Sequence, residues 1–204
     1  YVLKKPLKPP AFCMALRKHL KNGKITEIQQ HEFERIITIS VDTQEGVFQL
    51  VTELFGEGNV ILVSPQNIIL YALTYRRMRD RNILRGEAFR HAPSSGKNPL
   101  RVSRGEFDEI KQYGRLEIVR ALTKFLSIGG LHAEEILQRA EVNKDIDCAE
   151  LTEQQLDRIF IQLSTILSHV TTGKFEPSVV VNEKGEWVDA VPLRLTKYSN
   201  LSQK

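Results

Sequence analysis

Hydrophobic positions in the first half of the chain change from a helical to a strand-like spacing after residue 23. Phe12, Leu16 and Leu20 recur along one helix face, which predicts an amphipathic helix over Ala11–Leu20 that stops near Asn22 and Gly23. Short runs rich in Val, Ile and Phe follow, separated by turn residues, at 25–28, 36–41, 47–54, 60–63 and 68–73. This alternation of runs and turns predicts an antiparallel meander.

The second half of the chain has helical periodicity. The segment 91–98 contains Pro, Ser and Gly and predicts an exposed loop, with a domain boundary near Val102. Ser103 and Glu106 have the spacing of a capping box. Helices are predicted over 116–126, 131–140 and 153–170, the last ended by Gly173, and a β-hairpin over 179–191 that returns to the first sheet.

The pattern therefore predicts an α+β fold in three parts. Residues 1–102 form an antiparallel β-rich domain, 103–173 a small helical module, and 174–204 the closing hairpin. The chain starts at Tyr1 in the middle of a pattern, so we expect a natural segment before it.

Basic residues are clustered, although the formal net charge is only +4. The first block, before residue 27, contains no acid and comprises Lys4, Lys5, Lys8, Arg17, Lys18, Lys21 and Lys24. The second contains only Asp80 and Glu87 as acids and comprises Arg76, Arg77, Arg79, Arg81, Arg85, Arg90, Lys97, Arg101 and Arg104. Two such blocks are either solvated faces or, as we favour, a surface for a polyanion, since phosphate binding needs several cations at once.

The sequence gives little support for a disulfide, a metal site or a catalytic centre. Cys13 and Cys148 are far apart, and the five histidines lack metal-ligand spacing. There is no phosphate-binding Gly-Lys-Ser/Thr motif and no ordered nucleophile and base. We predict no metal, no cofactor and no catalytic residues. No apolar run reaches the roughly 18 residues of a membrane span, which favours a cytoplasmic protein without membrane contact.

Gly129 and Gly130 lie between two predicted helices, as in a helix-hairpin-helix. In that motif glycines let backbone N–H groups approach a phosphate at the positive end of the next helix. The alternative is an ordinary turn between two helices, and the turn alone does not decide between them.

Several segments together resemble the NFACT family, of archaeal and eukaryotic-like type. They are Pro9-Pro10-Ala-Phe-Cys-Met-Ala-Leu-Arg-Lys-His-Leu20, Glu32-Phe-Glu-Arg-Ile36, Glu53-Leu-Phe-Gly-Glu-Gly-Asn-Val-Ile-Leu62, Gly86-Glu-Ala-Phe89, Gly129-Gly-Leu-His-Ala-Glu-Glu-Ile136 and Val188-Asp-Ala-Val-Pro-Leu193. The resemblance implies a domain similar to the N-terminal domain of formamidopyrimidine-DNA glycosylases, then a helix-hairpin-helix module. A coiled coil would follow this region in full-length members.

The resemblance also implies a function. NFACT proteins resemble ribosome quality-control factors that bind tRNA and an obstructed large ribosomal subunit and support template-free C-terminal tailing of the stalled chain. It implies tRNA contacts by Glu34 and Arg35, where the family has an Asp-Arg pair, and by Glu53. We add Arg17 and Lys18 as phosphate contacts, Gly129 and Gly130 as a phosphate-binding hairpin, and weak DNA binding.

Two alternatives belong to other classes of protein. One is a glycosylase-like enzyme that processes nucleic acid, although the family lacks the N-terminal proline chemistry of the glycosylases. The other is a fibronectin-binding adhesin, because bacterial relatives often carry that label. We expect a binding protein and not an enzyme.

Overall fold

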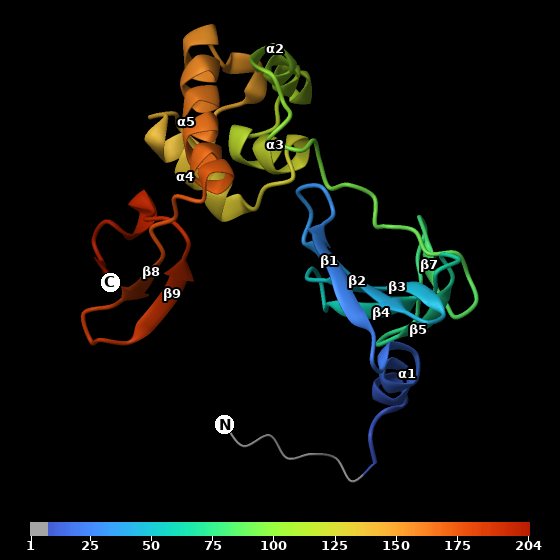
Figure 1. Ribbon diagram of the computed structural model, residues 1–204. Coiled ribbons are helices and arrows are strands. Elements are labelled where there is room, and N and C mark those ends of the chain that lie inside the picture. Colours follow the sequence, from blue (N-terminus) through green and yellow to red (C-terminus); the bar gives the residue numbers. More distant parts are fainter. Residues whose placement is uncertain (1–7) are drawn as a thin grey trace. The chain divides into compact units, whose positions relative to one another are not determined.

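The structure is a computed structural model that describes residues 8–204, and the chain divides into two compact units between Ser94 and Ser95 (Figure 1). The predicted α+β class is confirmed. The division lies before Val102 because the backbone of residues 95–97 already pairs within the second unit. The Lys97 N–H donates to the Phe125 carbonyl (2.8 Å), and the Ser127 N–H donates to the Lys97 carbonyl (3.0 Å).

The first unit is one helix and an antiparallel meander, as predicted. The elements are α1 (Ala11–Leu20), β1 (Lys24–Gln30), β2 (Ile36–Thr43), β3 (Gly46–Glu53), β4 (Asn59–Val63), β5 (Ile69–Ala72), β6 (Arg76–Arg77) and β7 (Asn82–Ile83). Strands β1 to β5 form one sheet in sequence order, and β6 pairs with β7 in a separate small hairpin. Lys4 and Lys5 of the first basic block lie outside the described residues.

The two faces of the five-stranded sheet have different covers. One face holds the buried cluster that includes Ile36 and Val51, and Ile83 and Phe89 from the segment after β5 pack on it. Phe48 lies three residues before Val51 on β3, so its side chain points to the other face. There the His19 ring of α1 lies 5.5 Å from the Phe48 ring. Helix α1 and the later segment therefore contribute to opposite faces.

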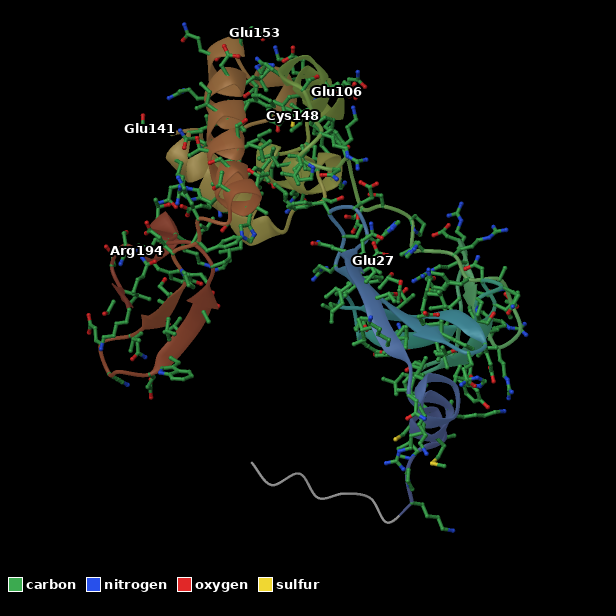
Figure 2. All side chains as sticks on the ribbon, in the orientation of Figure 1. Glu27, Glu106, Glu141, Cys148, Glu153 and Arg194 are labelled. Carbon is green, nitrogen blue, oxygen red and sulfur yellow. The ribbon has the colours of Figure 1, made fainter. Side chains whose placement is uncertain are left out.

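Strand β1 is an edge of this sheet, and all of its residues are exposed. Its pairing with β2 contains a register shift between Ile25 and Glu27, which is a β-bulge. Figure 2 shows Glu27 on this strand, just after the bulge.

The second unit contains the helices and a three-stranded sheet. The elements are α2 (Arg104–Phe107), the 3₁₀ helix η1 (Asp108–Tyr113), α3 (Ile118–Phe125), α4 (Gly130–Arg139), η2 (Cys148–Glu150), α5 (Glu153–Thr172), β8 (Ser178–Val181), β9 (Trp187–Val191), η3 (Thr196–Tyr198) and β10 (Ser202–Gln203). The predicted helices are confirmed to within a few residues at their ends.

Local chemistry explains where these helices begin and end. Ser103 and Glu106 form the predicted capping box at α2, and Thr152 and Gln155 form another at α5. Each box satisfies backbone donors that the first helical turn leaves free, an effect of about 1 kcal/mol. Gly173 has φ 67°, a left-handed conformation that ends α5 and suits a residue without a side chain.

The predicted β8–β9 hairpin is present, but it does not join the first sheet: it lies in the second unit and forms a separate sheet with β10. Buried Glu135 of α4 connects the hairpin region to the helices. Its carboxylate accepts hydrogen bonds from the backbone N–H (2.9 Å) and the hydroxyl (2.8 Å) of Thr196. Arg139, one turn later, donates to the same carboxylate (2.6 Å).

Candidate nucleic-acid interface

The cations of the first basic block lie on and just after α1. The helix packs on the sheet through Ala15, which is buried, and through the half-buried His19, while Arg17 and Lys18 are exposed on its last turn. Lys21 and Lys24 are also exposed. Among residues 8–204, none of these four cations has an acidic partner within 4.0 Å. Arg17 and Lys18 therefore present positive charge on α1 that no ion pair within the described part of the chain occupies.

Part of the second basic block adjoins this surface. The Arg85 guanidinium lies 4.7 Å from the centroid of the Tyr71 ring on β5, and the His19 ring of α1 lies 6.4 Å from the same ring. Tyr71 therefore lies between Arg85 of the second block and the helix that carries Arg17 and Lys18 of the first. A cation over an aromatic face is attracted by the ring, which fixes the place of the Arg85 charge beside the basic helix.

The rest of the second block is divided among different roles. Arg76 pairs with Glu57 (2.7 Å), and Arg81 is buried. In the second unit, Arg104 binds Asp108, Glu153 and Asp157, and Lys97 binds Glu109 (2.7 Å). Figure 2 shows Glu153 at the start of α5, the end of that helix that Arg104 of α2 reaches. Arg104 thus links α2 to α5, and the other cations named here also have acidic partners, so the predicted block does not form one free surface.

Glu34 and Arg35 lie in the turn between β1 and β2. The turn is fixed by its backbone: the Glu34 N–H donates to the His31 carbonyl (3.0 Å), and the Leu54 N–H donates to the Arg35 carbonyl (2.7 Å). Ser94 donates to the Glu34 carboxylate (2.9 Å), while the Arg35 side chain is exposed. The turn therefore holds a charged pair of side chains in a defined position at one end of the sheet.

Glu53 lies at the same end of the sheet, opposite Ile36, but inside the unit. Its carboxylate Oε1 is 2.6 Å from Nη1 of Arg81, and the side chains of the pair are 5% and 4% exposed. The same Arg81 nitrogen donates to the Arg90 carbonyl (3.0 Å). Glu53 is thus the buried counter-ion of Arg81 and fixes the position of that side chain. The exposed charge at this end of the sheet is that of Arg35.

A pair of stacked histidines completes this end of the sheet. The rings of His31 and His91 are parallel within 7° and 3.7 Å apart, and Phe89 packs edge-on against His91. Burial lowers the pKa of His91 below its ordinary 6.5, and the charges of His31 and Arg81 lower it further, against a weaker opposite effect of Glu53. Spacing along the sequence gave no signal for this stack.

The two predicted parts of the interface in the first unit lie at opposite ends of β1. The strand begins beside Asp42, near the end of α1, and finishes beside Ile37, next to the Glu34–Arg35 turn. At about 3.3 Å per residue the strand is about 20 Å long. A ligand that touches both α1 and Arg35 must therefore be an extended molecule.

The Gly129-Gly130 turn joins α3 to α4, with Gly129 as the N-cap and Gly130 as the first helical residue. Gly129 has φ −80°, and neither glycine has a positive φ. A Cβ added at either position would meet nothing within 4 Å. Neither the backbone conformation nor internal packing therefore requires glycine at these positions.

Other reactive groups contribute no site. Cys148 is buried between the helices (Figure 2), and burial raises the pKa of its thiol to about 11. Residues 8–204 contain no cluster of three or more His, Cys, Asp and Glu side chains placed to hold a metal ion. No helix in the same range combines the length and the apolar composition needed to cross a membrane.

The meander, its basic helix and the helical unit define a known class. The chain belongs to the NFACT family, because the family's "NFACT N-terminal and middle domains" match residues 2–204. Among curated proteins it is 34% identical over 209 residues to the archaeal Rqc2 homolog aRqcH of Methanocaldococcus jannaschii. That alignment covers the whole of this chain and 31% of the relative. It is 31% identical over 150 residues to the Rqc2 homolog RqcH of Bacillus subtilis, covering 66% of this chain and 26% of the relative.

The chain is also 32% identical to the human ribosome quality control complex subunit NEMF, over 72 residues that make up 35% of this chain and 7% of NEMF. All three relatives are ribosome quality-control proteins. The chain spans about a third or less of their length. Two solved structures share the fold. One is the N-terminal part of a fibronectin/fibrinogen-binding protein from Streptococcus suis, with a TM-score of 0.69 and 24% identity, covering 100% of this chain and 72% of that one. The other is a fibrinogen-binding protein from Staphylococcus aureus, with a TM-score of 0.72 and 20% identity, covering 97% of this chain and 72% of that one.

Proposed function

We propose that this chain is the tRNA-binding part of a ribosome quality-control factor that acts at an obstructed large ribosomal subunit and supports template-free tailing of the stalled chain. In this role it binds RNA and is not itself an enzyme. The observation that carries the proposal is the position of Arg85, 4.7 Å from the Tyr71 ring that His19 of the basic helix α1 also approaches.

The free cations support a phosphate backbone as the ligand. Arg17 and Lys18 are exposed on one helix turn, have no acidic partner among residues 8–204, and can displace counterions from RNA. Arg35 adds an exposed guanidinium about 20 Å away along β1, at the end of the sheet where the resemblance implies tRNA contact. The separation suits a tRNA and exceeds the reach of a single nucleotide.

The hairpin of the second unit supports a further phosphate contact. Gly129 and Gly130 face open space and have no positive φ, so their lack of a side chain leaves the backbone accessible to close approach by an external group. The first N–H groups of α4 are the donors that such a group would meet.

The test is binding of the 204-residue chain to tRNA over a series of salt concentrations. We expect the logarithm of affinity to fall linearly with the logarithm of salt. Reversing two charges, Arg17→Glu with Lys18→Glu, should reduce the slope by about 2, because each phosphate contact contributes about one unit.

A matched control changes the same charge elsewhere. Lys174 and Lys184 are exposed in the second unit, outside α4 and its hairpin, so Lys174→Glu with Lys184→Glu should leave the slope nearly unchanged. Equal effects of the two double variants would show that net charge alone governs binding and would refute the proposed interface. Absence of salt-dependent binding to tRNA would refute the function.

A further inference from the structure

The segment after β5 forms an open, shallow pocket of about 390 Å³ within the first unit. Its exposed lining is formed by Met78, Arg79, Asp80, Glu87, Ala88 and Arg90. Arg81, which is buried and paired with Glu53, also contributes to the lining. Pockets of about 300 Å³ and more are of the size that accommodates small organic ligands.

Backbone hydrogen bonds fix both walls of this pocket. One wall is the turn that closes the β6–β7 hairpin, where the Met78 N–H donates to the Arg81 carbonyl (3.2 Å). The other wall is held against β5 and the residues before it: the Ile69 N–H donates to the Glu87 carbonyl (2.8 Å), and the Phe89 N–H donates to the Asn67 carbonyl (2.9 Å). The cavity is therefore formed before a ligand arrives, which reduces the ordering cost of binding.

The pocket presents positively and negatively charged side chains that form no ion pairs with one another. Arg79, Arg90, Asp80 and Glu87 are exposed, and none of them has an ion pair within 4.0 Å among residues 8–204. Arg81, by contrast, is neutralised by Glu53. The free guanidinium groups can donate to a phosphate, and the free carboxylates can only accept hydrogen bonds, which suits amino groups.

We propose that this pocket binds one unstacked nucleotide of the RNA, with its phosphate on Arg79 and Arg90 and the amino group of its base on Asp80 or Glu87. A base with an exocyclic amino group is preferred over uracil, because a carboxylate accepts from that amino group and repels a carbonyl. The Met78 thioether supplies a polarisable contact for the base. This inference rests on the proposed RNA-binding function and adds to it a position that reads the base.

The test compares fluorescent pentacytidylate and pentauridylate, which differ in the groups at one edge of the base, by anisotropy with the 204-residue chain. We expect pentacytidylate to bind at least about fivefold more tightly. Asp80→Asn with Glu87→Gln should abolish this preference without weakening pentauridylate binding. The changed residues Asp80 and Glu87 are exposed, so the double variant should fold.

Arg79→Ala should weaken both oligonucleotides several-fold. Arg77→Ala is its matched control, since Arg77 is exposed on the same hairpin but does not line the pocket. Equal affinities for the two oligonucleotides, or equal effects of the two arginine variants, would overturn the pocket assignment. If tRNA binding persists in its salt series in that case, the proposed function stands; if tRNA binding is also absent, both fail.

Discussion

Oε1 of Glu53 lies 2.6 Å from Nη1 of Arg81, and the side chains of both residues are almost completely buried. This contact joins the end of β3 to the segment that lines the pocket, since Arg81 also donates to the Arg90 carbonyl. Glu53 is therefore a positioning residue, which holds Arg81 and through it the backbone of Arg90.

Breaking this pair should be costly, while replacing both partners should not. Glu53→Leu or Arg81→Met alone leaves one buried charge unpaired and should lower the free energy of unfolding by about 3–5 kcal/mol. The double variant should cost much less than the sum of the two. Urea unfolding of the four proteins measures this coupling, and additive costs would contradict it. The exposed Glu57–Arg76 pair is the control: Glu57→Ala should cost less than about 1 kcal/mol.

Alanine at the hairpin glycines should separate folding from binding. Gly129→Ala and Gly130→Ala place a methyl group in open space at ordinary φ, so the free energy of unfolding should change by no more than about 1 kcal/mol, with a loss at the N-cap Gly129 and a gain at Gly130. Affinity for tRNA should fall, because the methyl group blocks the backbone. Gly114, with φ 60°, is the contrasting control, since alanine there should destabilise the fold. Unchanged tRNA affinity in both hairpin variants would remove the phosphate contact.

The His31–His91 stack should make stability depend on pH below about 6.5. The pKa of His91 is lowered in the folded state, so the unfolded chain takes up a proton first as pH falls. The free energy of unfolding should therefore decrease from about pH 6.5 downward until the lowered pKa is passed. Thermal unfolding over this range should show a weaker pH dependence in His91→Phe, which keeps the ring. A dependence unchanged in His91→Phe, or equally weakened in His132→Phe in the second unit, would contradict the assignment.

Glu135 should stabilise the second unit far more than its neighbour on α4. Burial alone would raise the pKa of Glu135, but hydrogen bonds from Thr196 and Arg139 outweigh it and leave the pKa lowered. This stabilisation is present above the ordinary pKa near 4.5 and is lost as pH falls through the lowered value. At neutral pH, Glu135→Ala should cost about 2 kcal/mol by leaving buried donors unpaired.

The matched control for that variant is Glu134→Ala. Glu134 makes a surface pair with Lys144 (3.0 Å), which should contribute less than about 1 kcal/mol. Unfolding followed by far-ultraviolet circular dichroism reports on the helices of this unit. Similar losses in the two variants would mean that the Thr196 contacts do not hold the hairpin region.

Much of the fold could be predicted because its signals are local. Turn residues separate the strands of the meander, and the capping box of Ser103 and Glu106 needs only two residues three positions apart. The place of Arg104 could not be predicted in this way. Its partners Glu153 and Asp157 lie on a helix far along the chain, so its inclusion in a free basic block follows from composition and not from packing.

The candidate site was predictable in part for the same reason. Exposure of Arg17 and Lys18 follows from the helical period of α1, whose apolar side faces the sheet. Burial of Glu53 was signalled by strand alternation, because it lies two residues after the buried Val51 on the same face. Its partner Arg81 and the His31–His91 stack depend on how the segment after β5 folds over that face, which no periodicity encodes.

The extra residue in β1 has a consequence for behaviour in concentrated solution. An open, flat strand at the rim of a sheet invites a second copy of the molecule to continue the ladder and so to start aggregation. The irregular spacing near Thr26 and the negative charge that follows it disturb such a ladder at its first rungs. The same strand that spans the distance between the basic helix and Arg35 is thus shaped against continuation of the sheet by a second copy of the chain.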